Sequence, residues 1–211
     1  MLYEAVKGGE VHYASPSMDK ESVGKLIGTD KNKVSYASAD NLGYGYIGIS
    51  ARFVPDINIR RAIMSTLNPQ DCVDYYGGSG ASVIYRPMSK TLKKYYPTEA
   101  GPYYTYDETG KTALDLAKLS GCTVGSDGKL RDKDGKRLKY TFTIAGNSDD
   151  HPANAMLNHA REILNRVGFE IEISYDSTAL SKLSSGLLTV WAAAWSSSSD
   201  PDMYQVYHKN S

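Results

Sequence analysis

The 211-residue sequence has no excess of charge of either sign, because its 24 basic and 24 acidic side chains cancel. This balance argues against a nucleic-acid-binding protein, which needs a cationic face. Long apolar runs are also missing: the most hydrophobic segment, residues 186–195, is much shorter than the ~18 residues of a membrane-spanning helix. The length permits one generous domain or two small ones.

Cysteine and phenylalanine are scarce, with two and three copies. Cys72 and Cys122 are too few for a disulfide framework, so we expect two free, packed thiols. Aromatic area comes instead from 17 tyrosines. Their rigid rings with a polar tip suit surfaces that are exposed to solvent and also bind other molecules. An ordinary tyrosine-rich surface is an equally good interpretation. The first residues, 1–4, show neither the cationic start nor the apolar core of a signal peptide.

The motifs of common catalytic sites are incomplete. Residues 110–112 imitate the end of a phosphate-binding loop, but Thr105 stands where that motif needs a glycine. The four histidines are scattered without a completed metal-ligand set, and we interpret residues 149–151 as a polar turn that caps the following helix. The serines at 196–199 lack the Gly-x-Ser-x-Gly context of a nucleophile. The sequence therefore predicts no catalytic residue, no metal site and no cofactor.

Hydrophobic periodicity predicts an α/β lobe, because helical and strand patterns alternate along the chain. Strands are expected over 41–51, 138–144, 169–175 and 187–194. Helices are expected over 17–27, 59–67, 113–119, 153–167 and 179–183, with a further short helix beginning at Pro69. Glycines at 43, 45 and 48 indicate that another group packs close to the first strand. The loop-like residues 77–106 are long enough to suggest a functional segment.

Two stretches carry a family resemblance. Residues 53–80, FVPDINIRRAIMSTLNPQDCVDYYGGSG, and residues 195–201, WSSSSDP, resemble the family 5 solute-binding proteins of peptide and nickel ABC importers. In that family a strand ends at a Phe-x-Asp step and a helix follows that reads x-[Val/Ile]-Arg-x-Ala-[Ile/Leu]. Here the corresponding positions are Phe53, Asp56, Ile59, Arg60, Ala62, Ile63, Asn68-Pro69 and Gly77–Gly80. Residues 165–173 also resemble a helix end and the strand that follows it in this family. Residues 9–13 resemble the family's Gly-Glu-[Ile/Val]-Asp sequence, where the chain leaves the first lobe.

The resemblance implies a periplasmic-binding-protein-like lobe of the class II, peptide-binding type, with a mixed sheet flanked by helices. We expect residues 1–211 to be a single ligand-binding lobe excised from a larger two-lobed protein. Residues 1–15 would be the end of the first lobe and a hinge strand, and residues 16–211 the lobe proper. The first residues alone would suggest a cytoplasmic protein. The resemblance implies instead an extracytoplasmic protein, in the periplasm or at the cell surface, as a lipoprotein whose anchor is absent from this chain.

The resemblance also nominates ligand-binding residues. Trp195 would stack on the ligand, Ser196, Ser197 and Ser198 would offer polar contacts, and Tyr44 and Tyr46 would line the cleft. Trp191 lies either on the opposite face of its strand or beside Trp195.

The charge pattern around Trp195 departs from that of many peptide-binding relatives. Those relatives carry an Asp about three residues after the tryptophan, or an Arg three residues before it, for the termini of a peptide. Ser198 (or Ser197) and Ala192 occupy these positions here. An ion pair to a peptide terminus is therefore missing from this lobe.

The implied function is that of the substrate-binding component of an ABC importer, in the first place for oligopeptides. Two lobes would close on the ligand around a hinge and deliver it to membrane permease subunits. The expected partners are thus an oligopeptide or another small solute and the permease, with no nucleic acid and no enzymatic activity. A binder of a sugar or nickel chelate is the main alternative. A hydrolase, or a protein-interaction module that uses the tyrosine-rich loop, is a remoter one.

Overall fold

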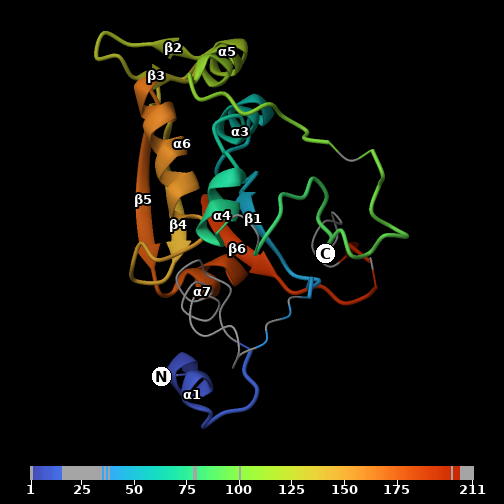
Figure 1. The fold of residues 1–211 in the computed structure, drawn as a ribbon. Coiled ribbons are helices and arrows are strands. Elements are labelled where there is room, and N and C mark those ends of the chain that lie inside the picture. Colours follow the sequence, from blue (N-terminus) through green and yellow to red (C-terminus); the bar gives the residue numbers. More distant parts are fainter. Residues whose placement is uncertain are drawn as a thin grey trace.

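The centre of the protein is a four-stranded mixed β-sheet (Figure 1). The computed structural model describes residues 2–15, 35, 37, 39–77, 80–99, 101–200 and 202–204. The strands of the sheet are β1 (Tyr44–Ile49), β4 (Lys139–Ala145), β5 (Glu170–Asp176) and β6 (Val190–Trp195), in the order β1-β6-β4-β5. Strand β4 runs parallel to β5 and β6, whereas β1 is antiparallel to β6. A separate hairpin pairs β2 (Thr123–Val124) with β3 (Leu130–Arg131).

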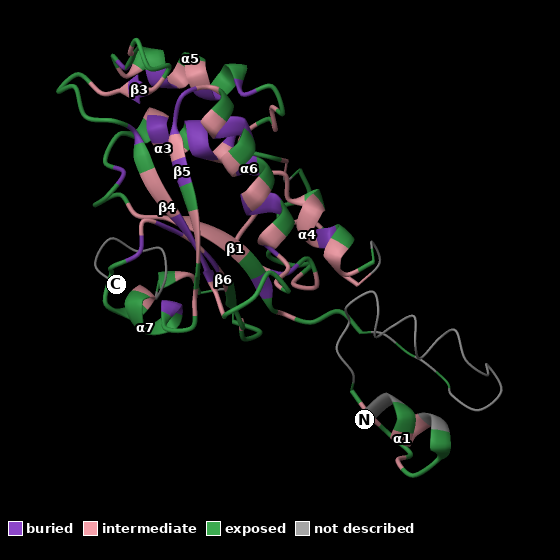
Figure 2. Ribbon diagram, turned by 90° about the vertical axis from the view of Figure 1, so that its left-hand side faces the viewer, coloured by how far each residue is buried: buried purple, intermediate pink, exposed green. Residues whose placement is uncertain are grey.

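Helices cover both faces of the sheet. The described helices are α1 (Leu2–Gly8), α3 (Ile57–Met64), α4 (Gln70–Tyr75), α5 (Lys111–Leu119), α6 (Asn154–Arg166) and α7 (Ala179–Ser184). Helices α4 and α6 lie on one side of the sheet and α7 on the other (Figure 2). This placement is required by right-handed crossovers, because β4–α6–β5 and β5–α7–β6 step across the sheet in opposite directions.

The hydrophobic core lies between the sheet and helices α3 and α6. Phe142 and Ile144 of β4 are fully buried, and they belong to one cluster with Ile63 of α3. Helix α6 contributes a continuous apolar stripe, because its buried residues recur at helical spacing. They are Met156, Leu157, Ala160, Ile163 and Leu164.

Most of the expected elements are confirmed, with shifted ends. Strand β6 begins at Val190 rather than Leu187 and includes Trp195. Helix α3 ends at Met64, so Leu67 is buried just beyond the helix rather than within it. In α5, Leu119 was expected on the apolar stripe but is 73% exposed. The helix expected over 17–27 lies outside the described residues.

Two expectations require correction. Strand β4 was expected to be half-buried, but Thr143 on its polar face is only 5% exposed. The reason is that β4 is an interior strand, with β6 and β5 on its two sides and α7 in contact with it. A hinge strand was expected within residues 1–15. Among the described residues of this segment the structure instead forms helix α1 and no strand.

Gly48 gives the tight packing that the glycine pattern of β1 predicts. A Cβ atom at this position would lie 2.2 Å from Cε2 and Cζ2 of Trp191, which pairs directly with Gly48 across the two strands. Trp195 pairs with Tyr44 in the same register. The register between the two pairs is unbroken, and every second side chain of a regular strand is on the same face, so Trp191 and Trp195 lie on one face. The alternative of opposite faces is therefore wrong.

We predict that Gly48→Ala destabilises the full-length protein by about 1–3 kcal/mol, because the new methyl group must displace the Trp191 indole. Chemical unfolding followed by circular dichroism measures this. Gly45→Ala on the same strand is the matched control, since its Cβ would meet only the Ala193 carbonyl oxygen, at 3.9 Å. Equal midpoints for the two variants would contradict the contact.

Candidate functional site

A large open cavity lies at one edge of the sheet. Strands β4, β5 and β6 are parallel, so their carboxyl ends meet at this edge, where the antiparallel β1 begins. The cavity is lined there by Ala145, Ala192–Trp195 and Tyr44–Ile47. Its volume of ≈ 2750 Å³ exceeds the roughly 300–1,000 Å³ of ordinary small-molecule pockets. Carboxyl ends of parallel strands are a common location for ligand sites in α/β proteins.

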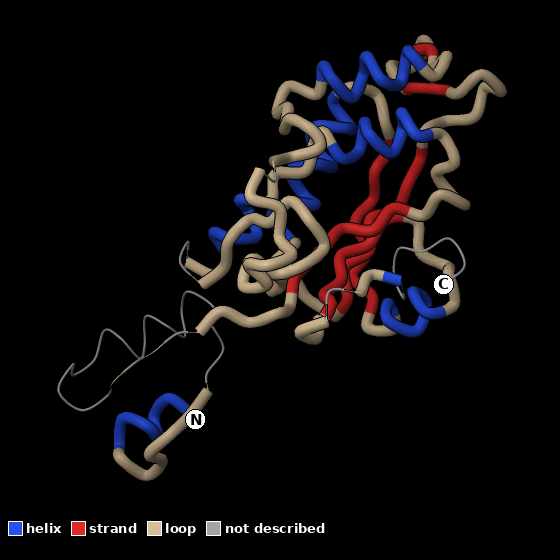
Figure 3. Tube along the Cα trace, turned by 90° about the vertical axis from the view of Figure 1, so that its right-hand side faces the viewer, coloured by secondary structure: helices blue, strands red, loops and turns tan. Residues whose placement is uncertain are grey.

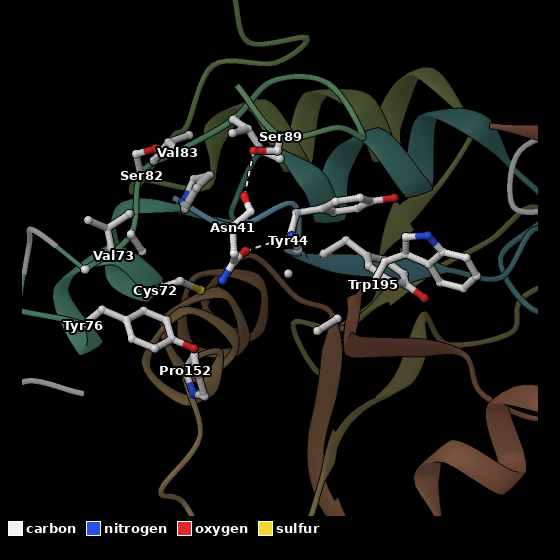
Figure 4. A pocket seen from close by; sticks show the side chains of 18 of the residues that line it. Asn41, Tyr44, Cys72, Val73, Tyr76, Ser82, Val83, Ser89, Pro152 and Trp195 are labelled. Carbon is white, nitrogen blue, oxygen red and sulfur yellow. Dashed lines mark hydrogen bonds between the residues drawn. The ribbon is translucent and has the colours of Figure 1, made fainter. Parts of the chain in front are cut away.

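Tyr44, Tyr46 and Trp195 form an aromatic group on this wall. Tyr44 pairs with Trp195 across β1 and β6, and the rings of Tyr44 and Tyr46 lie 6.2 Å apart between centroids. Tyr44 is nearly buried, whereas Trp195 is 38% exposed. Figure 4 shows both side chains at the cavity. The indole thus rests at the cavity wall with area available for a ligand to stack on.

The serines that follow β6 differ in their position relative to the cavity. Ser196 and Ser197 line the cavity. Ser198 is not among the described lining residues, because its hydroxyl turns into its own loop, where it accepts from the Asp200 N–H at 3.3 Å. The Ser197 Oγ is buried and has no hydrogen-bond partner in the described part of the chain. The structure therefore brings five of the six expected binding residues to the cavity and leaves Ser198 out.

The segment over 80–106 covers one side of the cavity, and forms neither helix nor strand over its described residues. Ser89 fixes its position: the buried hydroxyl donates to the Asn41 carbonyl at 2.9 Å and accepts from the Thr91 N–H at 3.2 Å. The Arg86 guanidinium donates to the Gly101 carbonyl at 3.1 Å and lies over the Tyr103 ring. Figure 3 shows this segment as coil beside the sheet. The expected long loop is confirmed. Ser89 anchors it to Asn41, whereas Arg86 joins two parts of the loop itself.

Sequence reasoning missed the far end of the cavity. Cys72 and Tyr76, at the end of α4, line it together with Pro152 and Met156 at the start of α6. The Cys72 thiol contacts the Met156 sulfur at 4.0 Å. Burial raises the pKa of Cys72 to about 11, and burial also raises the pKa of Tyr76, so both groups stay uncharged at neutral pH. No local motif marks these residues, because α4 and α6 meet only in the folded chain.

Neither cysteine forms a disulfide, and His151 takes part in a turn. Cys72 and Cys122 are both free thiols, as expected. His151 Nδ1 accepts from the Ala153 N–H at 3.1 Å, so a polar turn does precede α6, but no side chain of the described residues caps this helix. Burial lowers the pKa of His151 and favours the neutral ring that accepts this bond. In the described part of the chain no group of three or more His, Cys, Asp or Glu residues could hold a metal ion.

Comparison with known proteins assigns the chain to a family. The family model described as "Bacterial extracellular solute-binding proteins, family 5 Middle" matches residues 2–211. The chain belongs to this family. Its members are extracellular binding proteins rather than enzymes, and their middle region corresponds to nearly all of this sequence. No helix in the described ranges is long and apolar enough to cross a membrane.

Individual relatives agree with this assignment. The oligopeptide-binding protein AppA of Bacillus subtilis is 25% identical over 213 residues, which cover 97% of this chain and 37% of AppA. The structure of AppA in complex with a nonapeptide superposes with a TM-score of 0.74 at 22% identity, covering 99% of this chain and 41% of AppA. NikZ from Campylobacter jejuni, in complex with Ni(L-His), gives 0.67 at 17% identity, with 98% and 40% covered. The chain thus spans about two-fifths of these relatives.

Proposed function

We propose that this chain forms one wall of the ligand cleft in the substrate-binding component of an ABC importer, and that the ligand is an oligopeptide. The observation that carries the proposal is the open, aromatic-lined cavity at the carboxyl edge of the sheet, in a chain of the family 5 solute-binding proteins. The similarity to AppA, which is named as an oligopeptide-binding protein, supports a peptide over other solutes.

The composition of the cavity wall suits an extended peptide. Stacking on Trp195 and on the tyrosines is tolerant of sequence, because a ring face contacts many kinds of group. In the described part of the chain, the cavity lining includes three Asp, Glu, Lys or Arg side chains: Asp40, Arg86 and Lys90. Ala192 and Ser198 leave no ion pair for a peptide terminus near Trp195. The terminal charges of the ligand would therefore be bound away from Trp195.

The mechanism would be closure of two lobes on the ligand. Residues 16–211 form one lobe in this proposal, and residues 1–15 are the end of the other lobe. The position of α1, set apart from the sheet and its helices, supports that division (Figure 1). Closure around the hinge would bury the peptide and present a surface to the permease subunits. The protein would act outside the cytoplasm as an anchored lipoprotein.

Native mass spectrometry of the full-length protein from its own host, followed by identification of the released ligand, tests this function. We expect a mixture of peptides of similar length, because stacking and backbone contacts do not select one sequence. A single non-peptide solute, such as a sugar or a nickel chelate, would keep the two-lobed mechanism and overturn the oligopeptide assignment.

A further inference from the structure

One end of the cavity carries a compact apolar group that none of the expected binding residues belongs to. We define it as the apolar subsite: Cys72, Val73, Tyr76, Val83, Pro152 and Met156. These residues come from three elements, namely α4, the covering loop and the start of α6. Figure 4 shows the labelled members gathered opposite Trp195, around the same hollow. The subsite is therefore continuous with the aromatic wall rather than a separate pocket.

The subsite carries no charged side chain. Two carboxylates close in sequence to subsite residues are already engaged: Asp71 accepts from Asn68 at 3.0 Å and lies 2.8 Å from His159 Nδ1. Asp150 accepts from the Tyr75 hydroxyl at 2.9 Å. A charged ligand group placed here would lose its hydration without gaining a partner, whereas an apolar group would gain by leaving water.

The two sulfur atoms make the subsite adaptable. Cys72 and Met156 contact each other at 4.0 Å, and the flexible, polarizable thioether of Met156 fills irregular space well. A pocket made only of branched side chains would select one shape. Here Cys72, Met156, a proline and a tyrosine ring stand beside the two valines, so the wall accepts aliphatic and aromatic side chains of several shapes.

We propose that the apolar subsite binds one uncharged, apolar side chain of the peptide, aliphatic or aromatic, and so sets a preference at one ligand position. This rests on the proposed function, since a peptide must reach the cleft for its side chain to enter. Trp195 and its neighbours would then hold the ligand regardless of sequence, while the subsite adds selectivity at a single residue.

The thiol of Cys72 provides a direct test. The full-length protein is labelled with methyl methanethiosulfonate, with and without peptides of one length that carry Leu, Phe, Gly, Lys or Asp at each position in turn. Mass spectrometry of the digest gives the labelling rate of each cysteine. Because its high pKa leaves little thiolate, labelling is followed over hours at about pH 9. Cys122 is the control, as a free thiol that is more deeply buried than Cys72 and does not line the cavity.

At one ligand position, we expect Leu and Phe peptides to slow Cys72 labelling about tenfold or more relative to the bound Gly peptide, with Cys122 unchanged. The same Leu and Phe peptides should bind about tenfold or more tightly than the Lys and Asp peptides. Cys72→Phe, which fills the subsite, should remove that preference.

The opposite results separate the two proposals. Equal protection of Cys72 by all bound peptides, or protection by none of them, would overturn the subsite while leaving peptide binding intact. Failure of every peptide to bind, by calorimetry, would overturn the proposed function itself. The labelling comparison uses the unaltered protein, so it remains decisive even where Cys72→Phe does not fold.

Discussion

Replacing Phe142 with alanine should lower the free energy of unfolding by about 3–5 kcal/mol, the largest loss we expect from a single substitution. Phe142 is fully buried in β4, between Ile173 of β5 and Val190 of β6. Truncation removes a ring from the centre of the core, and the paired strands on both sides prevent the sheet from closing over the gap. Urea unfolding of the ligand-free full-length protein, followed by circular dichroism, measures the loss.

Leu187→Ala is the control for this prediction. Leu187 lies just before β6 and is 59% exposed, so its truncation should change stability by no more than about 0.5 kcal/mol. The ligand must be absent in both measurements, because a bound ligand adds to apparent stability. A loss below about 1 kcal/mol for Phe142→Ala would mean that the core does not depend on β4.

Local pattern predicts the elements of this fold well. Helix α6 was expected from apolar residues at helical spacing, and the structure buries the same face, including Leu157 and Leu164. The end of the helix was also expected, at Gly168, which adopts a positive φ of 101° just after it. Such features are predictable because each depends on residues within a few positions of one another.

Pairing between distant segments was not predictable in the same way. The position of β4 inside the sheet, which buries Thr143, depends on which strands flank it, and periodicity within β4 carries no such information. The contact between Cys72 and Met156 joins residues 84 positions apart. This explains why the tyrosines and Trp195 were expected at the cavity from a family resemblance, whereas the apolar subsite became visible only in the folded chain.

The second large effect is expected at Trp195. Trp195→Ala should weaken binding of the natural ligand about 10- to 100-fold, because a partly exposed indole at the cavity wall supplies stacking area that alanine cannot replace. Stability should change little, since this side chain is 38% exposed and lies outside the core. Isothermal titration calorimetry with the peptides identified by mass spectrometry gives the affinity, and thermal unfolding of the ligand-free variant gives the stability.

Trp191 supplies the matched control, because it lies on the same face of the same strand but packs on Gly48 instead of lining the cavity. Trp191→Phe should lower stability through lost packing and leave affinity unchanged, the reverse of Trp195→Ala. Trp195→Phe should keep most of the affinity, since a ring face remains for stacking. If Trp195→Ala bound as tightly as the unaltered protein, the aromatic wall would be structural, and the ligand would have to be held by other residues of the cleft.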